Sequence, residues 1–215
     1  MGLLSGFLDL VLHLDQHLRD LALNYGPWVY AVLFGIIFFE TGLVVTPFLP
    51  GDSLLFVAGT VAAAGELDIH LMVLLLIAAA IAGDSLNYAI GHYLGPRVFR
   101  FDDSRFFKRA YVERTHAFFE RHGGKAIILA RFVPIVRTYA PFVAGIGAMH
   151  YRRFLMFNVT GAVLWVALLA YAGFFFGNLT WVRNNLTAVI LGIVLLSIMP
   201  GIVEYWRTRR ARLAR

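Results

Sequence analysis

Five ionisable residues lie within the most apolar stretches of the chain: Glu40, Asp52, Asp84, Arg131 and Arg137. A charge at the centre of a bilayer costs about 2.5–3.5 kcal/mol on insertion scales. We expect a chain that keeps both signs of charge there to use them on something polar that enters the membrane. Carboxylates in such places exchange protons when their surroundings change. A guanidinium stays charged and binds a phosphate group through paired hydrogen bonds.

The two arginines stand six residues apart in RFVPIVR, with Pro134 midway between them. Backbone amides left without a partner at a break near a proline would add donors for an anion. Arg131 and Arg137 therefore predict an anion site, and a lipid phosphate headgroup is its natural ligand within a membrane. The alternative is that both arginines pair with Glu40 and Asp52 and only orient the segments. The two interpretations are compatible if headgroup and carboxylate compete for the arginines.

Asp84 lies in the segment AGDSLNYAIG, where Asp84, Asn87 and Tyr88 share one face of a helix. This group is either a relay or part of a cavity, or a polar cluster that holds helices together. No hydrolase, metalloprotease or phosphate-loop motif is present in the sequence, so we expect no enzyme activity. Metal-ligand spacing is missing too, and we expect neither a bound metal nor a cofactor.

The composition indicates an integral membrane protein. Of 215 residues, 60% are hydrophobic and 15% are charged, whereas a soluble domain is about half apolar and a quarter charged. The formal net charge of +6 comes mainly from residues 97–125 and from the tail at 207–215. Basic clusters beside membrane segments usually face the cytoplasm. We therefore expect a cytoplasmic C-terminus and no nucleic-acid partner.

Residues 1–25 do not resemble a signal peptide, because acidic residues interrupt the apolar run. Polar residues recur there at helical spacing, with leucines elsewhere on the wheel. This pattern predicts an amphipathic helix lying at the membrane interface. An ordinary helix packed on the bundle is the alternative.

Three stretches are long and apolar enough to cross a hydrocarbon core, which needs about 20 residues. They are Leu71–Leu94, Phe154–Gly177 and Leu186–Trp206. The last of them predicts a C-terminal transmembrane helix. The charges at their ends predict that the first two run in opposite directions.

Two further apolar stretches, Trp28–Ala64 and Lys125–Met149, are interrupted by proline and glycine. Proline disrupts a helix, and irregular backbone at membrane depth is tolerated only inside protein or beside a wet cavity. We therefore expect re-entrant hairpins, or broken helices, at about 40–64 and 125–149. The residues at these breaks with an expected accessory role are Pro50, Gly51, Pro134 and Gly145.

The two halves of the chain share a four-residue sequence. Phe56-Val57-Ala58-Gly59 reappears as Phe142-Val143-Ala144-Gly145, and a spanning segment with a Gly-x-x-x-Gly ending follows each copy. We expect those endings, Gly91–Gly95 and Gly173–Gly177, to be close-packing faces. A hairpin plus a span, repeated with opposite orientation, is how many transporters are built. The predicted fold is thus an all-α polytopic membrane protein with an inverted repeat, whose membrane domain covers residues 26–206.

The segments GLVVTPFLPGDSLLFVAGT and GGKAIILARFVPIVRTYAPFVAGIGAM closely resemble the DedA family, the bacterial branch of proteins with a VTT, or SNARE-associated Golgi, domain. The resemblance extends from about Leu8 to the basic tail. It implies two opposed re-entrant hairpins. It also implies that the counterparts of four residues are required for function, namely Glu40, Asp52, Arg131 and Arg137.

The resemblance further implies a role in moving lipids across a bacterial inner membrane. Members of the family are linked to flipping of undecaprenyl phosphate or phosphatidylethanolamine and to the proton-motive force, and eukaryotic relatives are linked to scrambling. The expected partners are therefore a phospholipid or polyprenyl phosphate and protons, and the glycine faces permit pairing with a second copy. The alternatives are a proton-coupled antiporter of small cations or drugs, and a scaffold for envelope homeostasis that transports nothing.

Overall fold

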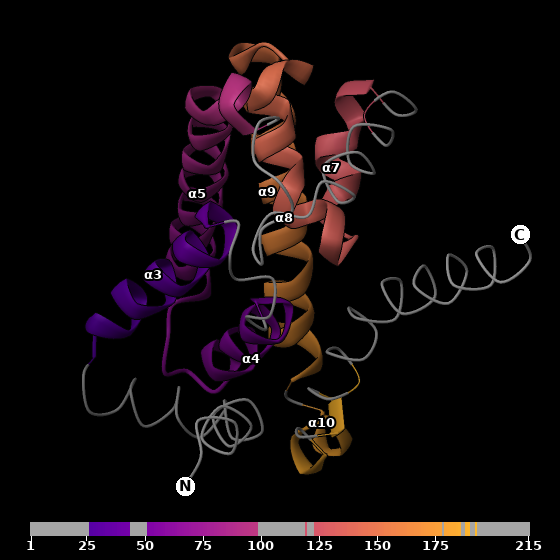
Figure 1. Ribbon diagram of the computed structural model, residues 1–215. Coiled ribbons are helices and arrows are strands. Elements are labelled where there is room, and N and C mark those ends of the chain that lie inside the picture. The colour runs from indigo at the N-terminus through magenta and orange to yellow at the C-terminus, as the bar shows by residue number, and fades with distance from the viewer. Residues whose placement is uncertain are drawn as a thin grey trace, which may run out of the picture.

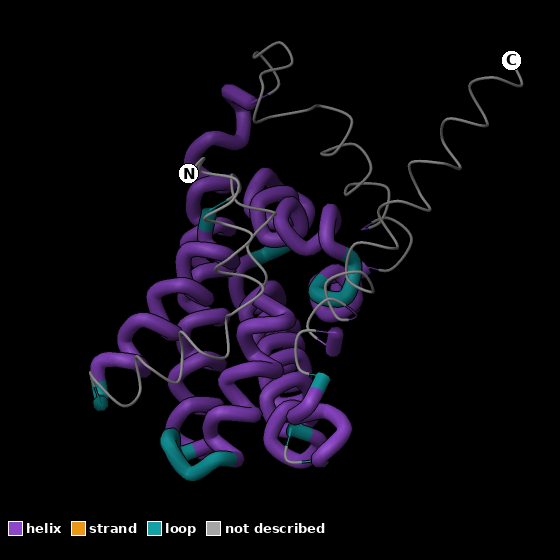
Figure 2. The backbone as a smooth tube through the Cα atoms, turned by 90° about the horizontal axis from the view of Figure 1, so that it is seen from below, coloured by secondary structure: helices purple, strands orange, loops and turns teal. Residues whose placement is uncertain are grey.

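The computed structural model describes residues 26–43, 51–98, 119, 123–177, 179–185, 188–189 and 192. Within this part of the chain every regular element is helical (Figures 1 and 2). Four sequence predictions fall outside the described residues: the helix in 1–25, Pro50, the basic tail and nearly all of the span predicted at 186–206.

Two long helices form the centre of the molecule. α5 (Ile69–Val98) and α9 (Tyr151–Phe176) each contain a stretch of 26 residues that is long and apolar enough to cross a membrane, at 69–94 and 151–176. They lie within three residues of the predicted spans at both ends. His70 at the start of α5 contacts Tyr171 near the end of α9, and Asn158 early in α9 donates to the Ile81 carbonyl. The two helices therefore run in opposite directions, as predicted (Figure 1).

The first interrupted stretch forms two half-length helices, α3 (Trp28–Gly42) and α4 (Gly51–Ala63). α3 follows α5 in the same direction, because Tyr30 accepts a bond from the Asp68 amide and Gly42 lies against Gly83. α4 follows α9, with Asp52 beside Trp165 at one end and Thr60 beside Gly177 at the other. The outer ends of α3 and α4 therefore lie at the same end of the bundle. Their inner ends meet near the middle of the long helices.

The second interrupted stretch is arranged in the same way, but its outer ends lie at the opposite end of the bundle. It comprises η1 (Gly123–Lys125), α7 (Ala126–Ala130), a turn at 131–133, α8 (Pro134–Val143) and the π-helical η2 (Ala144–Ala148). α7 follows α9, where Ile128 lies against Gly161. α8 follows α5, where Phe142 lies against Gly91. A short helix, α10 (Thr180–Asn184), comes after α9.

The two prolines of the second stretch act differently. Val133 is extended and Pro134 opens α8, as expected because the residue before a proline avoids helical backbone and the first helical turn needs no amide donor. Pro141, by contrast, lies inside α8. The interruption by proline that the sequence predicts for this stretch therefore does not occur at Pro141. The helix continues through it and then widens into η2, three residues later.

Each half of the chain packs its second short helix on the long helix of the other half. A methyl group on Gly59 of α4 would lie 2.1 Å from the Ala170 carbonyl oxygen of α9, and one on Gly173 would lie 2.0 Å from the Phe56 carbonyl oxygen. The same contacts recur between α8–η2 and α5. There a methyl group on Gly145 would lie 2.1 Å from the Tyr88 oxygen, and one on Gly91 would lie 2.1 Å from the Phe142 oxygen. Helices this close tolerate only hydrogen at these four positions, which confirms the predicted role of Gly91 and Gly173.

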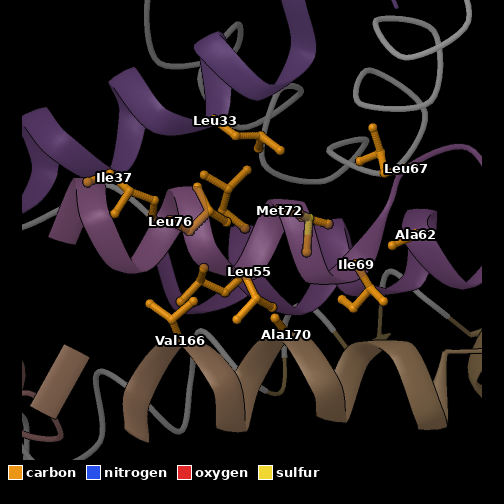
Figure 3. Packing of buried hydrophobic residues seen from close by; sticks show 14 of the residues in the cluster. Leu33, Ile37, Leu55, Ala62, Leu67, Ile69, Met72, Leu76, Val166 and Ala170 are labelled. Carbon is orange, nitrogen blue, oxygen red and sulfur yellow. The ribbon is translucent and has the colours of Figure 1, made fainter. Parts of the chain in front are cut away.

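Among the residues that the structure describes, the apolar core forms two clusters. The larger joins α3, α4, the first half of α5 and the second half of α9. Figure 3 shows Leu33, Leu55, Met72 and Val166 converging between these ribbons. The smaller joins α7, α8, η2, the later part of α5 and the start of α9. Along both long helices, polar residues fall where one cluster gives way to the other.

Candidate functional site

The four charged residues of the interrupted stretches lie at the inner ends of the short helices. Glu40 is in the last turn of α3, and Asp52 is in the first turn of α4. Arg131 immediately follows α7, and Arg137 is in the first turn of α8. Because the four inner ends face one another between the two apolar clusters, the fold brings together side chains that are up to 97 residues apart.

Arg137 lies between the two carboxylates of the first stretch. Its Nη2 donates to Glu40 Oε1 at 2.5 Å, and its Nη1 donates to Asp52 Oδ1 at 3.0 Å. The side chains of Arg137 and Asp52 are 15% and 23% exposed, whereas that of Glu40 is 7% exposed. We call Arg137, Glu40 and Asp52 the open cluster. It joins the start of α8 to both short helices of the other half.

Glu40 also lies against Gly51, the first residue of α4. A methyl group on Gly51 would lie 1.9 Å from Glu40 Oε2. Only glycine leaves room for the carboxylate there. The position also suits an anion, because the amino-terminal end of a helix carries partial positive charge. Gly51 therefore lets Glu40 approach both the start of α4 and Arg137.

Arg131 makes a different ion pair. Its Nη2 donates to Asp84 Oδ2 at 2.5 Å and to Asn158 Oδ1 at 2.6 Å. The side chains of Arg131 and Asp84 are only 3% and 8% exposed, and Asn158 is fully buried. We call Arg131, Asp84 and Asn158 the sealed cluster. It ties the turn after α7 to both long helices.

Trp165 of α9 connects the two clusters. Its indole nitrogen donates to Asp52 Oδ1 at 2.8 Å. Its ring lies 4.4 Å from the guanidinium carbon of Arg137 and 5.7 Å from that of Arg131. Trp165 is 1% exposed. A desolvated guanidinium over an indole face gains about 2 kcal/mol, so this side chain stabilises the open cluster as well as filling space.

Asn87 joins the inner ends of α3 and α8. Its amide donates to the carbonyls of Thr41 at 3.2 Å and Thr138 at 3.1 Å. On the same face of α5, the Tyr88 hydroxyl donates to the Met149 carbonyl at 2.9 Å. These bonds support the interpretation of Asn87 and Tyr88 as polar contacts that hold helices together. Asp84 belongs with Arg131 instead.

The site predicted from the sequence is assembled in part as expected. Arg137 pairs with both Glu40 and Asp52, as one interpretation required. Arg131 pairs with Asp84. Among the accessory residues, Gly51 and Pro134 lie at helix starts beside the clusters. Gly145 packs away from them on α5.

Two residues of the site, Asn158 and Trp165, were not identified from the sequence. With Gly161 they recur at positions i, i+3 and i+7 of α9, which places them on one helical face. That spacing was a usable signal. Tryptophan and a single asparagine are nevertheless common in spanning segments, and only the fold shows that this face meets the arginines.

The open cluster can exchange partners. A guanidinium that bonds each carboxylate with a different nitrogen can release one of them to a phosphate and remain neutralised by the other. A released carboxylate can take up a proton. The sealed cluster offers no such exchange, because removing one buried partner leaves an uncompensated charge.

Known proteins place this chain in a family. The VTT domain model matches residues 49–175. Protein DedA of Escherichia coli is 56% identical over 213 residues, which cover 98% of this chain and 97% of the relative. Inner membrane protein YghB of the same organism is 34% identical over 88% of each chain, and inner membrane protein YqjA is 37% identical over 70% of this chain and 68% of the relative. No solved structure matches.

Protein DedA matches nearly the whole length of the chain, and YghB and YqjA are named as inner membrane proteins. Together with the two apolar spans, this supports a location in a bacterial inner membrane. The chain is a membrane protein of the VTT-domain, or DedA, family.

Proposed function

We propose that this protein moves a lipid with a phosphate headgroup, of the undecaprenyl phosphate or phosphatidylethanolamine type, across the inner membrane as a flippase or scramblase. One observation carries the proposal. Arg137 is partly exposed and lies between two carboxylates of the opposite half, where the inner ends of the four short helices α3, α4, α7 and α8 meet. The function is transport and not catalysis, and it requires no metal or cofactor.

The interrupted stretches at about 40–64 and 125–149 act as re-entrant hairpins that enter from opposite faces and form an inverted repeat. Two observations support this arrangement. Each pair of short helices begins and ends at one end of the bundle, and the glycine contacts of one half recur in the other. Sites in such proteins lie near the bilayer midplane, where broken elements meet. The basic tail faces the cytoplasm in this arrangement.

The transport step uses competition for Arg137. A phosphate headgroup replaces Glu40 or Asp52 on the guanidinium, and the displaced carboxylate takes up a proton. With both carboxylates ionised, the open cluster carries a formal charge of −1. A proton therefore favours the binding of an anionic headgroup, which couples lipid movement to protons.

The proposal is tested by headgroup translocation in proteoliposomes, with and without a pH gradient. Arg137→Gln is expected to lower the rate at least tenfold, because no other group in the open cluster binds phosphate. Arg152→Gln is the matched control, since Arg152 is an exposed arginine at the start of α9, and it should retain the wild-type rate. Wild-type rates from Arg137→Gln would contradict the proposal.

A proton-coupled antiporter of small cations is the second candidate. The excess of carboxylates over guanidinium in the open cluster favours it, because a cation would neutralise that charge directly. Uptake of a soluble cation driven by a pH gradient, in vesicles that show no headgroup movement, would select this function. In that case Glu40→Gln should abolish uptake and Arg137→Gln should only weaken it.

A further inference from the structure

The two arginines of the site differ in their exposure and in the elements that supply their partners. Arg131 is 3% exposed and Arg137 is 15% exposed. The partners of Arg131 come from the two long helices, whereas those of Arg137 come from the two short helices of the other half. Arg131 is therefore attached to the two long helices, α5 and α9. Arg137 is attached to α3 and α4, whose inner ends lie in the middle of the bundle.

We infer that the sealed cluster is a structural lock and that Arg137 alone, among the described arginines, binds the headgroup. The inference refines the proposed function and rests on it: one guanidinium per lipid phosphate, with Asp84 and Asn158 as positioning residues. The similar placement of Arg131 and Arg137 in the sequence conceals this division.

Ligand exchange at Arg131 would be costly. One nitrogen, Nη2, serves both Asp84 and Asn158, and the Asn158 amide is itself committed to the Ile81 carbonyl. A phosphate that displaced Asp84 would leave a carboxylate 8% exposed and unpaired. Breaking a buried pair by removing one partner is strongly unfavourable. The sealed cluster is therefore built to persist.

The structural lock fixes the position of the turn at 131–133, which precedes α8 and Arg137. Arg131 begins that turn, and its side chain lies along Gly161 of α9, where a methyl group would be 3.0 Å from Nε. Asp84 fixes the same side chain to α5. With the turn held on both long helices, α8 starts at a set position and Arg137, six residues further on, faces the other half.

The open cluster retains charge balance during exchange. Arg137 uses Nη1 for Asp52 and Nη2 for Glu40, so a phosphate can replace Asp52 while Glu40 remains bonded. Asp52 is the more exposed partner, at 23%. It also keeps a second donor, the Trp165 indole, when Arg137 leaves it. Exchange at Asp52 therefore leaves neither charge without a partner.

Double-mutant rescue separates a lock from a binding group. In the full-length protein, Arg131→Gln and Asp84→Asn are each expected to lower the thermal unfolding temperature in detergent and to reduce translocation at least tenfold. The double variant Arg131→Gln/Asp84→Asn removes both charges and leaves amides for Asn158. It should recover the unfolding temperature and bring translocation to within about threefold of wild type.

The matched variant in the open cluster is Arg137→Gln/Glu40→Gln/Asp52→Asn, which likewise removes every charge of its cluster. It should keep a near-wild-type unfolding temperature and show no recovery of translocation. The probe in both cases is phosphatidylethanolamine with a fluorescent acyl chain, in vesicles of phosphatidylethanolamine and phosphatidylglycerol.

Recovery of the unfolding temperature in Arg131→Gln/Asp84→Asn without recovery of translocation would overturn the inference, because Arg131 would then be needed beyond its pairing. If this double variant fails to fold, the reciprocal exchange Arg131→Asp/Asp84→Arg takes its place, and failure of both to fold overturns the lock. Absence of translocation by the wild-type protein would instead defeat the proposed function. The rescue of stability still tests the lock in that event.

Discussion

At the scale of single residues, the indole of Trp165 performs two tasks that different substitutions separate. Its ring covers the Arg137 guanidinium, and its nitrogen donates to Asp52. Phenylalanine would keep an aromatic face and lose the donor. Leucine would lose both.

We expect Trp165→Phe to cost about 1.5–3 kcal/mol, the range for a hydrogen bond to a charged group, and Trp165→Leu to cost more because the cation–π contact is also lost. Translocation should fall in the same order. Thermal unfolding in detergent and the proteoliposome assay measure the two effects. Equal loss in both variants would show that the ring face contributes nothing.

Gly51 tests the close approach of Glu40 to α4. Gly51→Ala places a methyl group 1.9 Å from the carboxylate oxygen and should displace Glu40 from Arg137, at about 1–3 kcal/mol. Translocation should fall by about an order of magnitude. Gly35→Ala is the control, because nothing lies within 4 Å of a methyl group on Gly35 of α3. A wild-type rate from Gly51→Ala would show that Glu40 does not need this position.

The residues of the site were largely predictable, and their pairing was not. Charges in apolar sequence identified Glu40, Asp52, Arg131 and Arg137, because such charges are costly unless they are used. Which arginine meets which carboxylate depends on how the inner helix ends face α5 and α9. That arrangement is set by glycine contacts between distant segments, which sequence spacing does not reveal.

At the scale of elements, the short helices were predicted as interrupted segments, and their direction follows from contacts with the long helices. The positions of proline and glycine located the breaks near Gly51 and Pro134. Local rules failed at Pro141, because packing of α8 on α5 offsets the lost hydrogen bond. Tertiary contacts decide there between a kink and a continuing helix.

The entry side of each interrupted stretch is testable by thiol labelling, since the chain has no cysteine. Trp28→Cys and Ala64→Cys, at the outer ends of α3 and α4, should react with a membrane-impermeant reagent from the periplasm. Lys125→Cys and His150→Cys should react only from the cytoplasm. Labelling of Trp28→Cys and Ala64→Cys from opposite sides would exclude a re-entrant first hairpin.

The crossed helix contacts give a paired prediction. Gly59→Ala and Gly145→Ala each force a methyl group to within about 2.1 Å of a backbone oxygen. We expect each to lower the free energy of unfolding by about 1–3 kcal/mol. Thermal unfolding in detergent checks this against Gly35→Ala. Unequal effects at Gly59 and Gly145 would mean that the two halves do not share one packing rule.

At the scale of the whole molecule, the two halves are interlocked. α4 packs on α9 and α8–η2 packs on α5, so neither half buries its own second short helix. Rocking of one half as a rigid body against the other would separate both of these interfaces. Movement of the inner ends of the short helices about Arg137 would preserve them.

Interlocking predicts that the halves are stable only together. Residues 1–110 and 111–215, expressed as separate chains, should each be degraded in cells. Expressed together, they should assemble and restore translocation, because every crossed contact is available again. Immunoblotting of the membrane fraction measures the accumulation. A half that accumulates alone at full-length levels would contradict the arrangement.

The packing of each half's second short helix on the long helix of the other half also has a consequence for biosynthesis. Gly59 packs against Ala170, which is synthesised more than a hundred residues later. At ~5–20 residues per second, this contact can form only about 5–20 s after Gly59 has been made. For most of that interval Glu40 and Asp52 have been made, but Arg137, which follows Asp52 by 85 residues, has not. The nascent chain therefore needs either a sheltered place beside the insertion machinery or a protonated pair of acids until translation delivers its counter-charge.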